Sequence, residues 1–300
     1  MPDATIPDGT NATLHGYALL KAFGRSVTPA YGFERNDAIW DSLGDIARGF
    51  GKGFCFRLSR DDLAEYAFDD IWSQIIERTA QMRLAQHEVD LLLDMRHIDG
   101  EDAAVLAESI ISFLFHNPNV GGYRSVVIAG SSALKNVGSI EKEGTREVVR
   151  QELHLWSNLW RDMPDTVKPT FGDYGVIHPD FSDQAASPNV NAKIRHTAGD
   201  KIIYYRGHAL HKPVKDYAQY HKLARRVIAD FRHFNPARSY GDRYISDCAK
   251  EEIKPGSLAT WVIADMNHHI CYTARQLLRL THELANAATE READLALLAV

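Results

Sequence analysis

Residues 88–95, EVDLLLDM, are the stretch of sequence that decides the fold. Their apolar run is short, nearly continuous and ends in an acid, which is typical of a strand that is buried on both faces of a sheet. Residues 124–132, RSVVIAGSS, repeat this pattern and run into small residues. Strands of this kind occur in parallel sheets, where helices cover both faces. The two stretches therefore predict an α/β fold with a parallel sheet.

Strand and helix patterns alternate on either side of these two stretches. Further strand patterns lie at 26–31 (SVTPAY), 53–58 (GFCFRL) and 171–178, and helical spacing is found at 37–49, 61–82, 102–115 and 145–163. Such alternation predicts a parallel sheet with helices outside. Residues 191–197 and 200–207 are separated by Ala198 and Gly199, so they could form a hairpin. The chain then continues as helices.

The composition excludes several classes of protein. The formal net charge is −6, so there is no global basic field for nucleic acid, although a local basic pocket is compatible with it. Cys55, Cys248 and Cys271 form no CxxC pair, which suits a reducing cytoplasm and excludes a thiolate zinc site. No apolar run reaches the about 18 residues of a membrane span. We expect a cytoplasmic protein, with residues 1–300 as a single α/β domain.

The segment FGDYGVIHPD, residues 171–180, carries ionisable side chains inside a strand-like run. Glycines flank Asp173 and Tyr174, at places where a buried strand would carry valine or isoleucine. Glycines here could let the backbone or a ligand approach closely. Because packing does not explain two polar groups at this place, we predict that Asp173 and Tyr174 are catalytic. Asp173 would be a base or a metal ligand, and Tyr174 a proton donor or an orienting group.

Other polar side chains stand at the ends of the expected strands, where the sites of parallel α/β folds lie. Asp94 is a third catalytic candidate, as a base or metal ligand, with capping of the next turn as the alternative. The turn around Ser131 offers backbone N–H groups and a hydroxyl to an anion. Arginines at these ends could hold phosphate or carboxylate, or could pair with Asp94 and Asp173 in a structural network. The candidate ligand-binding residues are Arg57, Ser131, Arg195, His196 and Arg206.

Two histidine pairs are weaker candidates for a metal site. His208 and His211 have a spacing that would chelate an ion in a helix, but the neighbouring Pro213 favours a loop. His268 and His269 are adjacent and cannot share one helix face, so a structural role at a helix start is favoured. The metal ligands stay unassigned, with a divalent ion as the cofactor to test.

Several stretches taken together resemble one family, and they do so in order and content over roughly residues 14 to 279. They are VDLLLDM, SVVIAGSS, LHLWSNL, PTFGDYGVIHP, NAKIRHT, IIYYRG, AQYHKLARRVI, SYGDRYI and TWVIADMNHHICYTARQL. The chain resembles the phage-type "beta protein" family. The resemblance implies a (β/α) barrel-like architecture and a phage, prophage or bacterial defence setting, and it implies no particular reaction.

The chain departs from this family at two places. Only about 25 residues precede SVTPAY, where the family begins with two further strand–helix units, and position 196 is His where the family tends to have Tyr. We therefore expect a (β/α) barrel-like fold that is incomplete or irregular at its N-terminal units. The open edge could be covered by the N-terminal segment and the C-terminal helix, by a homodimer, or by a separate chain. Residues 265–300, a helix with an apolar tail, are the expected oligomer contact.

Two hypotheses of function follow from these residues. In the first, the protein is a hydrolase of a phosphate-bearing substrate, such as a nucleotide or a nucleic-acid end, and the arginines hold the phosphate. In the second, it is a non-catalytic interaction module that binds a phage or host protein. A pocket on which acids and arginines converge favours the first hypothesis, and a pocket plugged by paired side chains favours the second.

Overall fold

The chain forms two compact units, each described here by itself. The computed structural model describes residues 4–33, 39–180, 190–210, 216–231 and 234–298, with the side chains of residues 41 and 290–298 left outside the description. The first unit comprises Met1–Arg96, Asp102–Gly130 and Asn158–Asp173, and the second comprises His97–Glu101, Ser131–Ser157 and Tyr174–Val300. The description of residues 1–300 as a single domain stays a prediction.

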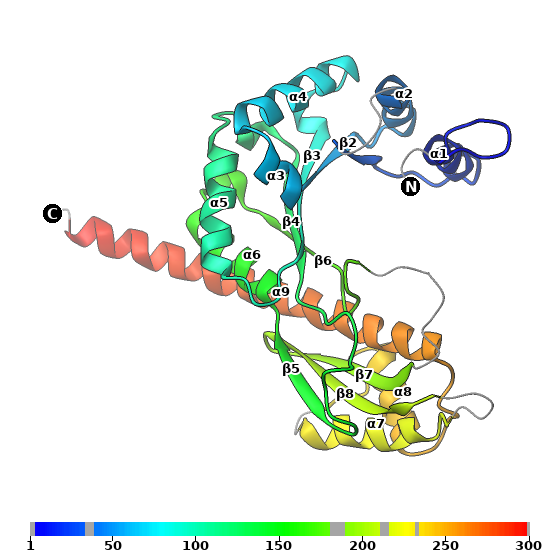
Figure 1. The fold of residues 1–300 in the computed structure, drawn as a ribbon. Coiled ribbons are helices and arrows are strands. Elements are labelled where there is room, and N and C mark those ends of the chain that lie inside the picture. The colour runs from blue at the N-terminus through cyan, green and yellow to red at the C-terminus, as the bar shows by residue number, and fades with distance from the viewer. Residues whose placement is uncertain (1–3, 34–38, 181–189, 211–215, 232–233, 299–300) are drawn as a thin grey trace. The chain divides into compact units, whose positions relative to one another are not determined.

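The first unit is built on a parallel sheet, as the alternating sequence pattern predicted (Figure 1). Its strands, in the spatial order β1-β2-β3-β4-β6, follow the order of the chain. Val89, Leu91 and Leu93 of the opening stretch are completely buried, which explains their continuous apolar pattern. The strands are β1 (Ala30–Gly32), β2 (Phe54–Ser59), β3 (Val89–His97), β4 (Ser125–Ser131) and β6 (Thr170–Asp173).

Local sequence signals set the helices of the first unit. Ser59 begins α3 through a capping box with Asp62. The rings of Trp72 and Phe113 stack with centroids 4.9 Å apart, and the Trp72 indole N–H donates to the Phe113 carbonyl, so α4 and α5 are joined. These helices are α1 (Ala12–Ala22), α2 (Trp40–Phe50), α3 (Arg60–Glu65), α4 (Phe68–Gln81) and α5 (Ala103–Phe115). Of α6 (Gln151–Asp162), only the residues from Asn158 onward belong to the first unit.

The second unit contains a separate antiparallel sheet, with the order β5-β8-β7. β7 (Asn191–Ala198) and β8 (Lys201–Ala209) form the expected hairpin. The grouping of their ends with those of the parallel strands is corrected, because β7 and β8 belong to this second sheet. A helix throughout 145–163 is also wrong: its first residues form β5 (Thr145–Val149), which pairs with β8. β8 offers a pairing partner that the local sequence does not reveal.

Both faces of this antiparallel sheet are covered. Ile203 and Tyr205 of β8 belong to a core cluster that includes residues of α7 (Gln219–Asp230) and α8 (Tyr240–Ala249) and Trp261 of α9 (Leu258–Leu298). Ile202 and Tyr204 pack on the other side, in a cluster with Ala133, Val137 and Ile140. This double burial explains why β8 is apolar along nearly its whole length.

A buried polar network fixes α9 against the rest of the second unit. Arg150 is fully buried and donates to Gln276 at 2.9 Å and to Thr273 at 3.0 Å, both on α9. The Gln276 amide in turn donates to the Gly199 carbonyl in the β7–β8 turn. These bonds set the rotation of α9, and therefore which of its side chains face the sheet.

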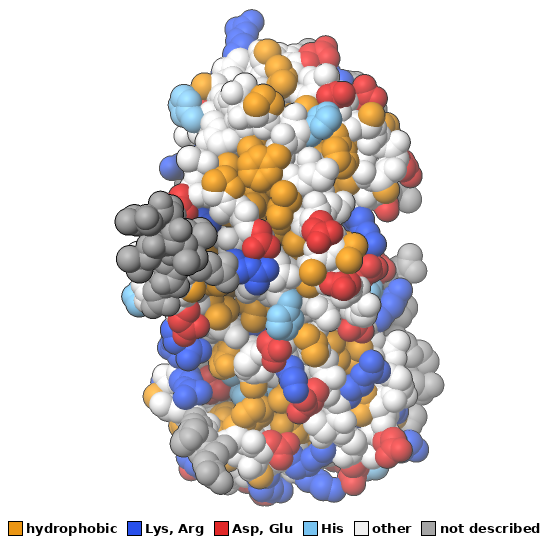
Figure 2. Space-filling view, turned by 90° about the vertical axis from the view of Figure 1, so that its left-hand side faces the viewer, with side chains coloured by type: hydrophobic (Ala, Val, Ile, Leu, Met, Phe, Trp, Pro, Cys, Tyr) orange, Lys and Arg blue, Asp and Glu red, His pale blue; other side chains and the backbone are white. Residues whose placement is uncertain are grey.

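Within the described ranges, no helix is both long and apolar enough to cross a membrane. On the face presented in Figure 2, basic and acidic side chains are interspersed. This mixture agrees with the modest net charge of −6. An anion site in this chain therefore depends on local geometry and not on a broad basic surface.

Candidate functional site

The first group of predicted residues lies in the parallel sheet. The Arg57 guanidinium donates to Asp94 at 2.9 Å, and Asp94 is almost completely buried. Asp94 also accepts the backbone N–H of Arg96 at 3.0 Å, which is the turn-capping role considered for it. The pair therefore has a structural explanation, while a catalytic role of Asp94 and a ligand-binding role of Arg57 stay predictions.

The glycines beside Asp173 and Tyr174 serve packing. A Cβ on Gly172 would lie 3.1 Å from the Ala129 Cβ of the neighbouring strand, so β6 and β4 approach closely there. Gly175 has φ +62, and a Cβ there would lie only 2.2 Å from the Met266 sulfur. Asp173 ends β6 opposite Gly130 and is half-buried. The catalytic roles of Asp173 and Tyr174 stay predictions, but the glycines need no ligand to explain them.

The other predicted ligand-binding residues, except His196, are engaged in structural contacts. Arg195 donates to Asp265 on α9 at 3.1 Å, and both side chains are buried. Arg206 donates to the carbonyls of Gly138 and Ile140. Ser131 is buried, and its hydroxyl accepts the N–H of Ala133 at 3.1 Å. The prediction that Arg195 and Arg206 stand at strand ends of the parallel sheet is wrong, because β7 and β8 lie in the antiparallel sheet.

One predicted residue, His196, belongs to a cluster of potential metal ligands. His196 on β7, Asp242 on α8 and His268 on α9 are all buried, and one donor atom of each lies within 4.8 Å of the others. We call these three residues the histidine–aspartate cluster. Burial lowers the pKa of His196 well below its usual value, and the nearby His268 lowers it further, so the His196 ring is neutral.

Contacts outside the cluster fix the direction of its groups. His268 Nε2 lies 2.9 Å from the Thr197 carbonyl oxygen, which can only accept, so Nε2 carries a proton. Ser239 begins α8 and donates its hydroxyl to the Asp242 carboxylate at 2.6 Å. His268 Nδ1 lies 2.9 Å from Asp242 Oδ1, yet this nitrogen makes no hydrogen bond of acceptable geometry. Burial acts to raise the pKa of Asp242, but His268 and Ser239 hold it below its usual value.

A pocket of about 210 Å³ opens beside the cluster. His196 and His268 line it together with Phe231, Phe234 and Arg238. The His196 ring lies 4.5 Å from the Phe231 ring, centroid to centroid. An apolar wall with a few polar groups is the usual design of a small-molecule site.

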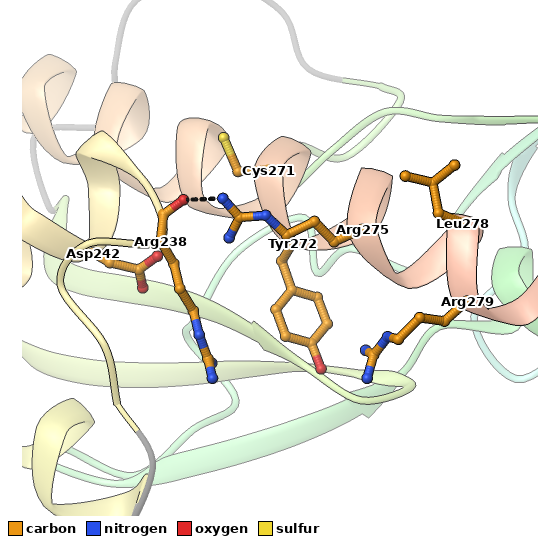
Figure 3. A pocket seen from close by; sticks show the side chains of 7 residues that line it. All are labelled: Arg238, Asp242, Cys271, Tyr272, Arg275, Leu278 and Arg279. Carbon is orange, nitrogen blue, oxygen red and sulfur yellow. Dashed lines mark hydrogen bonds between the residues drawn. The ribbon is translucent and has the colours of Figure 1, made fainter.

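A second and larger pocket, of about 560 Å³, shares Arg238, Asp242 and Tyr272 with the first (Figure 3). We call it the arginine pocket, because Arg238, Arg275 and Arg279 line it. Arg275 donates to the Arg238 backbone carbonyl at 2.7 Å and so holds the segment before α8. In the view of Figure 3, the guanidinium groups of Arg238 and Arg279 extend to the same side as the Tyr272 hydroxyl.

The Tyr272 hydroxyl accepts one hydrogen bond, and no described residue accepts a hydrogen bond from it. Its oxygen accepts the backbone N–H of Gly199 at 2.7 Å, which leaves its own O–H proton available to a ligand. Arg238 and Arg279 are exposed, and within the described part of the chain neither pairs with a carboxylate. Two guanidinium groups and a phenol donor in one pocket can bind an anion such as phosphate.

A sequence model of the family described as Beta protein matches residues 1–275. The chain belongs to the Beta protein family. This confirms the resemblance seen in the sequence. No curated protein matches this Beta protein. Among solved structures, triosephosphate isomerase from Bartonella henselae matches with 13% sequence identity over 59% of this chain and 68% of that chain, at a TM-score of 0.30. A likeness at that level carries no argument about the fold or function of the Beta protein.

Most of this Beta protein's candidate site could not be found from the sequence. The sequence favours a structural role at a helix start for His268, and this is wrong about the place, because α9 begins at Leu258. The sequence gives no comparable indication for Asp242, Arg238, Tyr272 or Arg279. Tyr272 and Arg279 lie on the helix that begins before His268, so their spacing of seven residues was a usable signal. The other histidine pair considered for a metal was His208 with His211. His208 is exposed, and its Nε2 lies 3.1 Å from Glu143 Oε1, whereas His211 is outside the described residues.

Proposed function

We propose that this Beta protein binds a phosphate-bearing ligand, such as a nucleotide or a nucleic-acid end, in the arginine pocket. The observation that carries the proposal is the pair Arg238 and Arg279, which line one pocket with the Tyr272 hydroxyl and have no carboxylate partner in the described residues. The volume of about 560 Å³ lies in the range of small-molecule sites. A nucleotide is large enough to use both pockets, with its phosphate at the arginines.

The chemistry of arginine favours phosphate as the bound group. A guanidinium has a planar set of donors that matches two phosphate oxygens at once. A hydrogen bond to a charged group contributes about 1.5–3 kcal/mol, so the loss of one arginine should weaken binding by about 10- to 150-fold. Arg238 and Arg279 come from different segments, so a ligand that contacts both must fit their spacing.

Isothermal titration calorimetry tests the proposal. The ligands are pyrophosphate, AMP, ATP, and one oligonucleotide with and without a 5′-phosphate. We expect Arg238→Met and Arg279→Met to weaken binding of the phosphorylated ligands by the factor given above. Arg243→Met is the matched control, because Arg243 is an exposed arginine of α8 that does not line either pocket. Failure of every phosphorylated ligand to bind, or equal weakening by the control, refutes the proposal.

A second candidate, a protein-interaction module, is favoured by apolar side chains on α9. Ile263, Ile270 and Leu278 are 59%, 57% and 74% exposed, and their spacing of seven and eight residues places them on one face of the helix. A second copy of this chain is the proposed partner, and a phage or host protein is the alternative. The apolar tail at 290–300 that suggested an oligomer lies outside the described side chains. Light scattering after size exclusion tests the dimer, which a monomer at high concentration contradicts.

The setting of the protein is also proposed. The stretches that resemble the phage-type family support a phage- or defence-associated role, with a (β/α) barrel-like relationship for the parallel sheet. The three free cysteines, Cys55, Cys248 and Cys271, support a cytoplasmic location. A comparison of plaque counts on bacteria with and without the gene tests the role: equal counts over a panel of phages contradict it.

A further inference from the structure

We infer that His196, Asp242 and His268 bind a divalent transition-metal ion of the zinc type. The cluster offers two imidazole nitrogens and one carboxylate oxygen within 4.8 Å of one another. Two histidines and a carboxylate form a frequent set of three protein ligands in catalytic metal sites, where the next position is left open. The inference rests on the proposed function only for the use of the ion, because metal binding itself can be measured without any phosphate ligand.

The contact between His268 and Asp242 is the strongest argument for an ion. His268 Nε2 is committed to the Thr197 carbonyl, so Nδ1 is the nitrogen that faces the cluster. It lies 2.9 Å from Asp242 Oδ1, but the two atoms do not have the geometry of a hydrogen bond. A buried nitrogen and a buried carboxylate oxygen that lie this close and are both available can bind one ion together.

Residues around the cluster hydrogen-bond to its side chains in the way that outer residues orient the ligands of known metal sites. Metal-binding histidines usually donate their second nitrogen to a carbonyl or carboxylate, as His268 does to Thr197. The Ser239 hydroxyl holds the other oxygen of Asp242 in the same way. His196 is 5% exposed, and its Nδ1 has no hydrogen-bond partner among the residues that the structure describes. An unsatisfied buried nitrogen is costly, and coordination of an ion would remove that cost.

The two histidine rings must open for a single ion to bind. They now stack, with centroids 3.9 Å apart and an angle of 16° between their planes. A nitrogen lone pair lies in the plane of its ring, so two parallel rings do not aim at one point. Within the described ranges, the Nδ1 of His196 has no hydrogen bond to lose if the ring turns. We therefore expect the angle between the rings to increase when the ion binds.

The open position of the ion would face the proposed ligand. The pocket beside the cluster is lined by His196, His268 and Arg238, and Arg238 also lines the arginine pocket. An ion here would act as a Lewis acid on a phosphate oxygen while the arginines hold the rest of the anion. Such an ion would select ligands whose phosphate reaches the cluster.

Metal content provides the test. The full chain without an affinity tag is stripped with a chelator, incubated with Zn²⁺ or Co²⁺, dialysed, and measured by plasma mass spectrometry. We expect about one ion per chain, in keeping with three protein ligands. Co²⁺ should also give visible absorption bands of a nitrogen- and oxygen-bound ion. A wild-type chain that stays metal-free after this treatment overturns the inference.

Variants locate the ion. We expect His196→Gln and Asp242→Asn to lower metal affinity by at least about 100-fold. His221→Gln is the control, since His221 is a half-buried histidine of the same unit outside the cluster. Unchanged metal content in both cluster variants overturns the inference. Should these variants fail to fold, anomalous scattering from a zinc-soaked crystal of the wild-type chain decides: a peak between the three side chains supports the site, and its absence refutes it.

The two proposals can fail separately. Phosphate binding that depends on Arg238 and Arg279 in a chain without metal affinity would leave the proposed function standing and refute the metal site. Metal binding that depends on the cluster, in a chain that binds no phosphorylated ligand with or without the ion, would support the metal site and refute the proposed function.

Discussion

Replacement of Arg195 by methionine should destabilise the protein strongly and in a pH-dependent way. The Arg195 guanidinium lies 3.1 Å from the Asp265 carboxylate, which is 0% exposed. Asp265 accepts only one other described hydrogen bond, from the backbone N–H of residue 195, and its second oxygen has no partner. The variant therefore leaves a buried carboxylate without its counter-charge.

The expected loss follows from the burial of the pair. Removal of one partner of a buried ion pair costs about 3–5 kcal/mol of unfolding free energy. Burial raises the pKa of Asp265 to about 7 even though Arg195 acts to lower it, so loss of Arg195 raises this pKa further. A raised carboxyl pKa means stability that is present at low pH and is lost as the pH rises through the folded value. The variant should thus lose more at pH 8 than at pH 5, by up to about 1.4 kcal/mol in total, because pH 8 lies only about one unit above the wild-type pKa.

Urea unfolding at pH 5 and pH 8 measures both effects, with the fluorescence of the buried Trp261 as a reporter near the pair. Arg195→Met with Asp265→Leu should recover much of the loss, because the pair is then replaced by apolar groups. A loss below about 1 kcal/mol at both pH values would contradict a structural role for Arg195. The predicted role in ligand binding would then regain its support.

Two further substitutions test the second unit. Burial lowers the pKa of Lys193 to about 8, so the folded state releases this proton more easily than the unfolded chain. Lys193→Met should therefore raise stability at pH 7 by about 1–3 kcal/mol, and the gain should vanish above about pH 10. Replacement of the half-exposed Lys201, whose ammonium pairs with Glu147, by methionine should give no such gain in the same thermal melts. A Cβ on Gly241 would lie 2.1 Å from the Ala264 carbonyl oxygen, so Gly241→Ala should cost about 1–3 kcal/mol or more in urea unfolding. Gly16→Ala, in open helical space, should be neutral or stabilising, and equal effects at the two glycines would refute the close contact.

The parallel sheet could be predicted because its strands carry their own evidence. Val89, Leu91 and Leu93 are buried, and the helices between the strands have clear periodicity. An apolar run alone does not show that a strand is parallel. The run KIIYYRG of β8 is just as apolar, but β8 belongs to the antiparallel sheet. Its adjacent residues Ile202 and Ile203 face two different core clusters, one on each side of an antiparallel sheet. A doubly buried strand does not reveal from its composition whether its neighbours are parallel.

The site was harder to predict because its residues come from three separate elements. His196, Asp242 and His268 lie on β7, α8 and α9, and each has an ordinary structural explanation in its own segment. Asp242 in particular stands three residues after Ser239, which caps α8 by accepting the backbone N–H of Asp242. The Ser239 hydroxyl also donates to the Asp242 carboxylate and so helps to orient it. The helix-cap pattern at Ser239 gave Asp242 a sufficient structural explanation, so the sequence did not point to Asp242 as a member of the cluster.

The adjacent histidines show how one strand residue can settle what the sequence left open. Adjacent helical residues point about 100° apart, so a helix that packs on one side normally buries only one of two adjacent side chains. Both are buried, because Thr197 of β7 meets each of them with a different group. Its carbonyl oxygen accepts from His268 Nε2, and its hydroxyl lies 2.7 Å from His269 Nδ1. The two contacts fix the rotation of α9 on β7. They commit one nitrogen of His268 to the strand, so its other nitrogen is turned toward Asp242, as a metal ligand in this cluster would require.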